Sequence, residues 1–230
     1  MRRFINNDFL LDSSSAINLF HNYVSGLPII DYHCHLSPED IAKDRQFNNL
    51  TEAWLEHDHY KWRLMRAGGV KEKYCSGDAP ARAKFIKWAE TLPNAVGNPV
   101  YHWSQLELLR YFDIDLLLRP ATADEIWEKA NTILAMPGYS VRGLLKKFRV
   151  EVVCTSDDPI DSLDYHRQIK EEDTGIRVLP GFRPDHAFRI EEISSFNEYL
   201  DRLAEVSSSD IISYDHLLLA MAKRMDHFAA

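Results

Sequence analysis

Three short apolar segments, each followed by a helical pattern, constrain the fold of this chain more than any other feature. They span residues 27–31, 150–155 and 176–182 and are rich in Val, Ile and Leu. Continuous apolar runs of this length are typical of strands buried on both faces of a parallel sheet. Helical periodicity follows the second and third segments, over 161–170, 195–204 and 213–228. The alternation of strand and helix predicts an α/β fold with a parallel sheet.

The long stretch between the first two predicted strands has no further strong strand signal. Helical patterns cover 51–67, 79–91 and 101–112, and another helix is predicted to start at Thr122, where the sequence TADE has the spacing of a capping box. We therefore divide the chain into three parts. Residues 1–36 form an N-terminal helix and the first strand, 37–148 a mostly helical insertion, and 149–230 the second and third β/α units.

Charge, cysteine usage and hydropathy exclude several classes of protein and of partner. The formal net charge of −8 would repel nucleic acids and acidic membranes, so neither is predicted as a partner. Three widely spaced cysteines fit reduced thiols better than a disulfide framework. The apolar runs are far shorter than the ~20 residues of a membrane span, and Asn6, Asn7 and Asp8 interrupt the position of a signal peptide. We expect a cytoplasmic protein.

His33 and His35 are the sharpest chemical feature of the sequence. They follow the first predicted strand with a spacing of two, which directs both imidazoles to the same face. Two convergent imidazoles can bind one divalent metal ion, although a site needs at least one more ligand. The alternative is a pair of ordinary hydrogen-bonded histidines.

Arg183 follows the third predicted strand, so in a parallel sheet it would reach the same edge as the histidines. Its planar guanidinium suits bidentate binding of a carboxylate, which an otherwise acidic protein would need in order to hold an anionic substrate. The alternative is a surface arginine in a weak ion pair.

His59 and Tyr60 lie in the predicted helix 51–67, and both could line one pocket only near a helix end, because consecutive helical residues diverge by about 100°. An imidazole and a phenol are suitable donors to a sugar oxygen or an enediolate. The alternative is a polar helix face above Trp54 and Trp62. Asp157 and Asp158 are either acids that support a site or caps of the following helix, and we favour caps.

Five segments together resemble the uronate isomerase family. They occur in the family's order and span nearly the whole chain: PIIDYHCHLSP at 28–38, WLEHDHYKW at 54–62, GNPVYHW at 97–103, TSDDPIDSL at 155–163 and GFRP at 181–184. One departure is Ser156, where the family typically has a second threonine, and this change keeps the hydroxyl.

The resemblance implies the N-terminal part of an amidohydrolase-type (β/α)8 barrel with a large helical insertion after the first strand. It also implies interconversion of D-glucuronate with D-fructuronate and of D-galacturonate with D-tagaturonate. By the same resemblance, His33 and His35 lie at a divalent metal, expected to be zinc, whose necessity is left open. His59 and Tyr60 act at the substrate as catalytic and binding groups, and Arg183 binds the sugar acid. A homo-oligomer is compatible with these properties.

Family members continue beyond 226–230 to a further metal ligand and the expected general base, so we expect these 230 residues alone to be inactive. Two other functions stay open. One is a metal-dependent hydrolase of the amidohydrolase superfamily, which shares the His-x-His strand. The other is a folding fragment or interaction module without catalysis.

Overall fold

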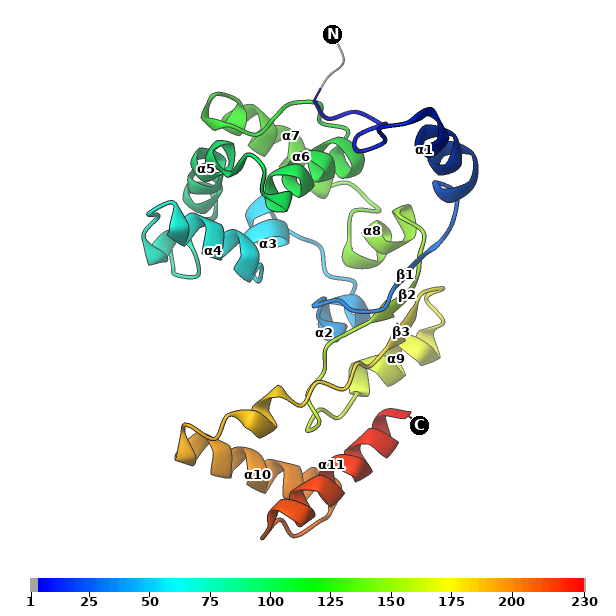
Figure 1. Ribbon diagram of the computed structural model, residues 1–230, viewed down its shortest axis with the longest axis vertical. Coiled ribbons are helices and arrows are strands. Elements are labelled where there is room, and N and C mark those ends of the chain that lie inside the picture. Colours follow the sequence, from blue (N-terminus) through cyan, green and yellow to red (C-terminus); the bar gives the residue numbers. More distant parts are fainter. Residues whose placement is uncertain (1–3, 230) are drawn as a thin grey trace. The chain divides into compact units, whose positions relative to one another are not determined.

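The computed structural model describes residues 4–229, and their contacts divide the chain into two compact units (Figure 1). The helical unit comprises Met1–Leu27 and Gln46–Ser140, and the sheet unit comprises Pro28–Arg45 and Val141–Ala230. Each unit is therefore built from two separate stretches of sequence. The three-part division made from the sequence follows the order of elements along the chain and stays a prediction.

The sheet unit contains the predicted parallel sheet. Its strands are β1 (Ile29–Asp31), β2 (Val150–Cys154) and β3 (Arg177–Leu179), in the order β1-β2-β3. Both pairs are parallel, which confirms the predicted strand direction and places β2 in the centre. The carboxyl ends of all three strands consequently lie at one edge of the sheet.

The first strand is not buried on both faces, contrary to the expectation from its apolar sequence. Ile29 is 47% exposed and Ile30 is 64% exposed, whereas Val153 in the central strand is 1% exposed. The apolar pattern alone cannot distinguish a central strand from an edge strand. Here β1 is an edge strand with a neighbour on one side only, and its side chains keep much of their contact with solvent.

Among residues 4–229, five α-helices complete the sheet unit. They are α2 (Pro38–Ala42), α8 (Val141–Lys147), α9 (Asp164–Glu172), α10 (Ile193–Ser207) and α11 (Tyr214–Ala229). Arg142 joins α8 to α2 and to α9. Its Nε donates to the carbonyl of Ile41 in α2 at 2.6 Å, and its guanidinium pairs with Glu172 of α9 at 2.7 Å. Helices α10 and α11 pack together through Tyr199, Leu203 and Ala220.

The helical unit has its own apolar core. Its helices are α1 (Ser14–Leu19) with a π-helical turn (Phe20–Val24), α3 (Leu50–Leu55), α4 (His59–Ala67), α5 (Ala81–Thr91), α6 (Pro99–Phe112) and α7 (Ala123–Leu134). Short 3₁₀ helices stand at Glu72–Tyr74, Leu92–Ala95 and Pro120–Thr122. Trp88 and Phe85 are the largest fully buried side chains. This unit confirms the predicted helical content between the first two strands.

Two features of the predicted helices in this unit are not found in the structure. The continuous helix expected over 51–67 is broken into α3 and α4, because Asp58 caps α4 through its side chain. Helix α7 does start after Thr122, but the hydroxyl of Thr122 donates to the carbonyl of Leu117 at 2.6 Å and does not cap the helix. The predicted capping box is therefore wrong, since this hydroxyl has a closer partner in the preceding turn.

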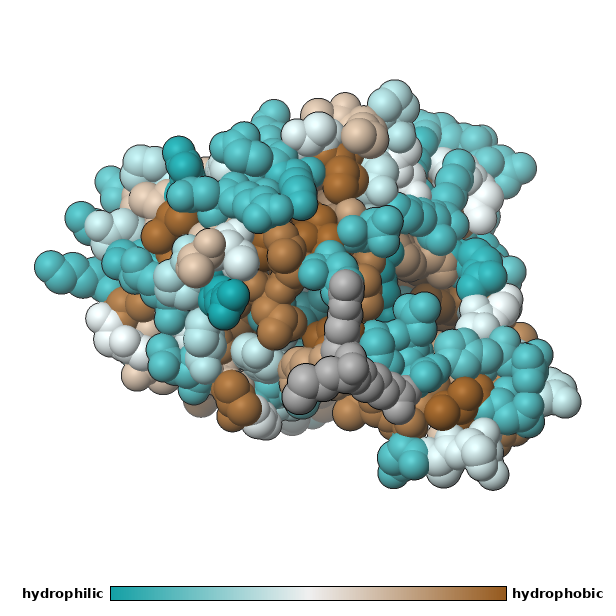
Figure 2. Space-filling model, turned by 90° about the horizontal axis from the view of Figure 1, so that it is seen from above, coloured by the Kyte–Doolittle hydropathy of each residue, from teal (hydrophilic) through white to brown (hydrophobic). Residues whose placement is uncertain are grey.

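The surface seen from above mixes hydrophilic and hydrophobic residues (Figure 2). Within residues 4–229, none of the helices is long and apolar enough to cross a membrane. The three cysteines, Cys34, Cys75 and Cys154, are free thiols.

Gly181, which follows β3, offers a test of the sheet's close backbone contacts. A Cβ atom at this position would clash with the carbonyl oxygen of Thr155, and two backbones held by strand pairing cannot easily separate. We expect Gly181→Ala to lower the free energy of unfolding by about 1 to 3 kcal/mol in urea titrations. Gly26→Ala, where a Cβ meets nothing within 4 Å, is the control and should change it by less than about 0.5 kcal/mol. Equal effects of the two substitutions would contradict this account.

Candidate functional site

The loops that carry the predicted site residues of the sheet unit are joined by backbone hydrogen bonds beyond the strand ends. The amide of Cys34 donates to the carbonyl of Cys154 at 2.9 Å. The amide of Asp157 donates to the carbonyl of Gly181, and the amide of Arg183 donates to the carbonyl of Asp157, both at 2.8 Å. Parallel pairing thus continues into the loops, so the segments after β1, β2 and β3 are held at one edge of the sheet.

His33 and His35 lie together at this edge, as their spacing predicted. Their ring centroids are 5.1 Å apart with an interplanar angle of 81°, and both side chains are exposed. The intervening Cys34 is partly buried, and burial raises the pKa of its thiol to about 11. Cys34 is therefore a neutral thiol at pH 7.

The pair meets part of what a metal ion requires. Two imidazoles can supply two ligands, but a closed site takes three or four. Across residues 4–229, the structure has no group of three or more His, Cys, Asp or Glu side chains arranged to hold a metal. The described residues therefore offer an incomplete ligand set, and further ligands would have to come from elsewhere.

Arg183 also lies at this edge, and its guanidinium has an ionic partner. Its Nε donates to Oδ2 of Asp185 at 2.8 Å, and the two side chains are 46% and 53% exposed. This is the weak surface ion pair considered as the alternative for Arg183. A substrate carboxylate would have to compete with Asp185 for the same guanidinium.

Asp157 organises a buried polar network that the sequence did not reveal. Its Oδ2 accepts hydrogen bonds from the hydroxyl of Thr155 at 2.6 Å and from the amide of Gly181 at 3.1 Å. Nε2 of His166 lies 2.8 Å from the same hydroxyl. Because the hydroxyl gives its proton to Asp157, we assign the Nε2 proton to His166, which then donates to Thr155. These three side chains are buried, so they fix the loop that leads to Arg183.

The preference for Asp157 and Asp158 as helix caps is wrong. Helix α9 begins only at Asp164, and the residue before it, Leu163, has a left-handed backbone and makes no side-chain cap. Asp158 accepts a hydrogen bond from the amide of Ile160 at 3.1 Å and lies 2.5 Å from Nδ1 of His186. The two aspartates serve the turn after β2, and a Thr-x-Asp spacing directly after a strand is the signal that could have indicated this.

Arg224 of α11 supports the same turn. Its side chain is buried, with Nε donating to the carbonyl of Pro159 at 2.6 Å and a terminal nitrogen donating to the carbonyl of Asp161 at 2.8 Å. Burial lowers the pKa of its guanidinium. The sequence pattern of α11 predicted a helix but not this role.

His59 and Tyr60 belong to the helical unit, where they are the first two residues of α4. Their ring centroids are 4.4 Å apart with an interplanar angle of 31°, and both side chains are exposed. The requirement for a helix end is therefore met. The packing considered in the alternative is present too, since Trp54 is buried and Nε1 of Trp62 donates to the carbonyl of Leu55 at 2.6 Å.

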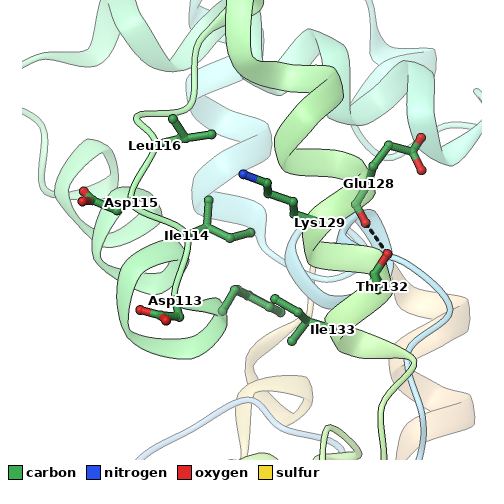
Figure 3. Close-up of a pocket in the computed structure, with 9 residues that line it drawn as sticks. Asp113, Ile114, Asp115, Leu116, Glu128, Lys129, Thr132 and Ile133 are labelled. Carbon is green, nitrogen blue, oxygen red and sulfur yellow. Dashed lines mark hydrogen bonds between the residues drawn. The ribbon is translucent and has the colours of Figure 1, made fainter.

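An open groove of about 660 Å³ lies elsewhere in the helical unit. It is formed by the loop after α6 and by α7, and Lys129 and Ile114 point into it while the carboxylates of Asp115 and Glu128 point away (Figure 3). None of the predicted site residues lines this groove.

Buried His166 predicts a pH dependence of stability. Burial lowers the pKa of its imidazole below the ordinary value of about 6.5, so the unfolded chain takes up a proton at a pH where the folded chain does not. Its contribution is complete above about pH 6.5 and should fall by at most about 1.4 kcal/mol per pH unit below it. In urea titrations at pH 7.5 and 5.5, His166→Gln should lose less stability on acidification than the wild type. The exposed control His57→Gln should behave as the wild type does, and identical pH profiles for all three would refute the assignment.

Known proteins resemble this chain over its entire length. A family model described as UxaC: Glucuronate isomerase matches residues 1–230. The solved structure of a uronate isomerase from Thermotoga maritima is similar with a TM-score of 0.91 and 37% sequence identity, covering 99% of this chain and 50% of that chain. A glucuronate isomerase from Caulobacter crescentus is similar with a TM-score of 0.86 and 26% identity, covering 98% of this chain and 49% of that chain.

The chain thus spans about half the length of the solved structures that it matches. Its three parallel strands and many helices correspond to part of a uronate isomerase structure. The family model covers far more than half of the chain, and the resemblance noted from the five sequence segments is confirmed. The chain belongs to the glucuronate isomerase family.

Proposed function

We propose that the full-length protein carrying this chain is a uronate isomerase that interconverts D-glucuronate with D-fructuronate and D-galacturonate with D-tagaturonate. The observation that carries this proposal is the match of nearly the whole chain to a solved uronate isomerase at 37% identity. In the proposed protein, β1, β2 and β3 are the first strands of a (β/α)8 barrel. The carboxyl edge of the sheet, with His33, His35 and Arg183, is then the substrate side, as in barrel enzymes generally.

The proposed reaction moves a carbonyl group from C1 to C2 of the sugar acid. A proton leaves C2 and another arrives at C1 through an enediol, while donors stabilise the negative charge on the oxygens. Arg183 binds the distant carboxylate, and its exposed guanidinium exchanges Asp185 for the substrate. His59 and Tyr60 orient the oxygens at C1 and C2. The general base is a further residue of the full-length protein.

Rigid support of the Arg183 backbone favours this role. The amide of Arg183 is held by Asp157, whose carboxylate is itself held by Thr155 and Gly181. A binding group on a fixed backbone loses less conformational freedom when the substrate arrives. An arginine that served only as a solvent-exposed surface charge would not need this buried network beneath it.

A divalent ion, with zinc as the first candidate, forms part of the proposal. His33 and His35 would supply two of its ligands, and further ligands would come from outside the described residues. Such an ion polarises oxygens as a Lewis acid when bound. The free thiols favour a cytoplasmic protein, and the net charge of −8 argues against nucleic-acid or acidic-membrane partners.

An NMR assay separates isomerisation from the hydrolysis that the wider superfamily suggests. The full-length protein is incubated in D₂O with D-glucuronate and, separately, with D-galacturonate. The proposal expects signals of the corresponding keto acid at the same carbon count and no cleavage product. A product that requires addition of water would favour a metal-dependent hydrolase, and unchanged substrate at high enzyme concentration would refute the isomerase.

Arg183→Met tests carboxylate recognition. The variant should lower kcat/KM for D-glucuronate by about 30-fold to 1000-fold, equivalent to roughly 2 to 4 kcal/mol, because the substrate carboxylate loses its charged partner. Arg177→Met is a matched control, since Arg177 lies at the amino end of the same strand β3. It should leave kcat/KM within about twofold. An Arg183→Met enzyme as active as this control would remove Arg183 from the site.

Zinc affinity tests the histidine pair. Competition with a chelating indicator should show zinc binding by the full-length protein, weakened at least about tenfold in His33→Asn and in His35→Asn, because each variant removes one nitrogen ligand. His21→Asn, which changes a histidine of the helical unit that pairs with Asp8, should retain wild-type affinity. Equal zinc binding by all the variants would show that the ion is held elsewhere.

A further inference from the structure

Lys61 is a buried charge directly behind the His59–Tyr60 pair in sequence. Only 4% of the residue is exposed, although lysine is rarely buried without a partner. Its Nζ donates to Oδ2 of Asp58 at 2.7 Å and lies 5.7 Å from the centre of the Trp54 ring. The ammonium therefore has a specific position between the start of α4 and the buried end of α3.

The partner of this ammonium is the residue that starts helix α4. Oδ1 of Asp58 accepts hydrogen bonds from the amide of Tyr60 at 2.9 Å and from the amide of Lys61 at 3.1 Å. Burial opposes ionisation of Asp58, but the charge and hydrogen bonds of Lys61 outweigh it and lower the pKa of the carboxyl group. One carboxylate thus joins the first turn of α4 to the buried ammonium.

Glu107 brings a third helix to the same cluster. Its Oε2 atom is buried and, within the part of the chain that the structure describes, has no hydrogen-bond partner. Burial raises the pKa of its carboxyl group, Lys61 acts in the opposite direction, and Asp58 adds to the rise. Helix α6, which carries Glu107, therefore places a buried acid, stabilised in its neutral form, within electrostatic range of the ammonium.

We propose that Lys61 is a positioning residue for the His59–Tyr60 pair, acting through Asp58. This proposal rests on the proposed isomerase function. The first turn of α4 carries both side chains, and its amides are held by a carboxylate whose other oxygen is held by Lys61. The ammonium of Lys61 lies over the Trp54 ring of α3 and interacts electrostatically with Glu107 of α6. Through these interactions the neighbouring helices hold the first turn of α4 in place. A residue that only filled space here would not need a charge, because apolar groups cost less to bury.

Kinetics of the full-length enzyme test this role. Lys61→Met should lower kcat for D-glucuronate at least tenfold, and Lys61→Arg, which keeps the charge, should recover part of the loss. In a Tyr60→Phe background, Lys61→Met should have less than a threefold further effect, because its influence passes through the pair. The control is Arg66→Met at the other end of α4, which removes an exposed ion pair with Glu72 and should leave kcat within about twofold. Independent, multiplying effects of Lys61→Met and Tyr60→Phe would overturn the proposal.

Amide hydrogen exchange supplies a readout that does not depend on activity. In Lys61→Met, the amides of Tyr60 and Trp62 should exchange at least tenfold faster, while those of Phe85 and Trp88 in α5 keep their wild-type rates. Acceleration of all four amides to the same extent would mean that Lys61 supports global stability only, and the proposal would then fail. If the wild-type enzyme does not isomerise uronates, the proposed function fails, whereas the exchange data still decide whether Lys61 holds the first turn of α4.

Discussion

The pairing of three parallel strands around β2 is the constraint on which the candidate site depends. Hydrogen bonds continue from β2 and β3 into the loops, so that Asp157 pairs with Gly181 and with Arg183 through the backbone. Cys34, between the two histidines, is joined to the end of β2 in the same way. Chemically useful side chains from three distant parts of the sequence thereby share one edge, because the carboxyl ends of parallel strands lie together.

Buried polar groups hold the candidate residues in both units. In the sheet unit, Thr155, Asp157 and His166 satisfy one another beneath the loop of Arg183. In the helical unit, the partly buried Asp58 and the buried Lys61 support the turn with Tyr60. Hydrogen bonds fix distance and direction, whereas apolar packing fixes mainly volume. The proposed site for a polar sugar acid would benefit from hydrogen-bonded supports of this kind.

Family membership establishes the fold of this chain more fully than it establishes its chemistry. Similar sequences pack similar cores, so a match over 99% of the chain establishes the architecture of these strands and helices. Catalysis depends on side chains brought together from a complete structure, and this chain spans about half the length of the solved relatives. The described residues accordingly include a pair of imidazoles but no group of three metal ligands.

The order and type of the elements were determined by the sequence alone, because periodicity is a local property of the chain. The three strands, most of the longer helices and the proximity of His33 to His35 follow from spacing along the sequence, whereas the short helices α2 and α8 were not predicted. Tertiary structure decided the rest. The exposure of Ile30, the split of helix 51–67 at Asp58 and the use of Asp157 to hold Gly181 depend on partners distant in sequence or on competing local hydrogen bonds. No periodic pattern encodes which donor a carboxylate meets after the chain has folded, and burial of an edge strand depends on what neighbours it.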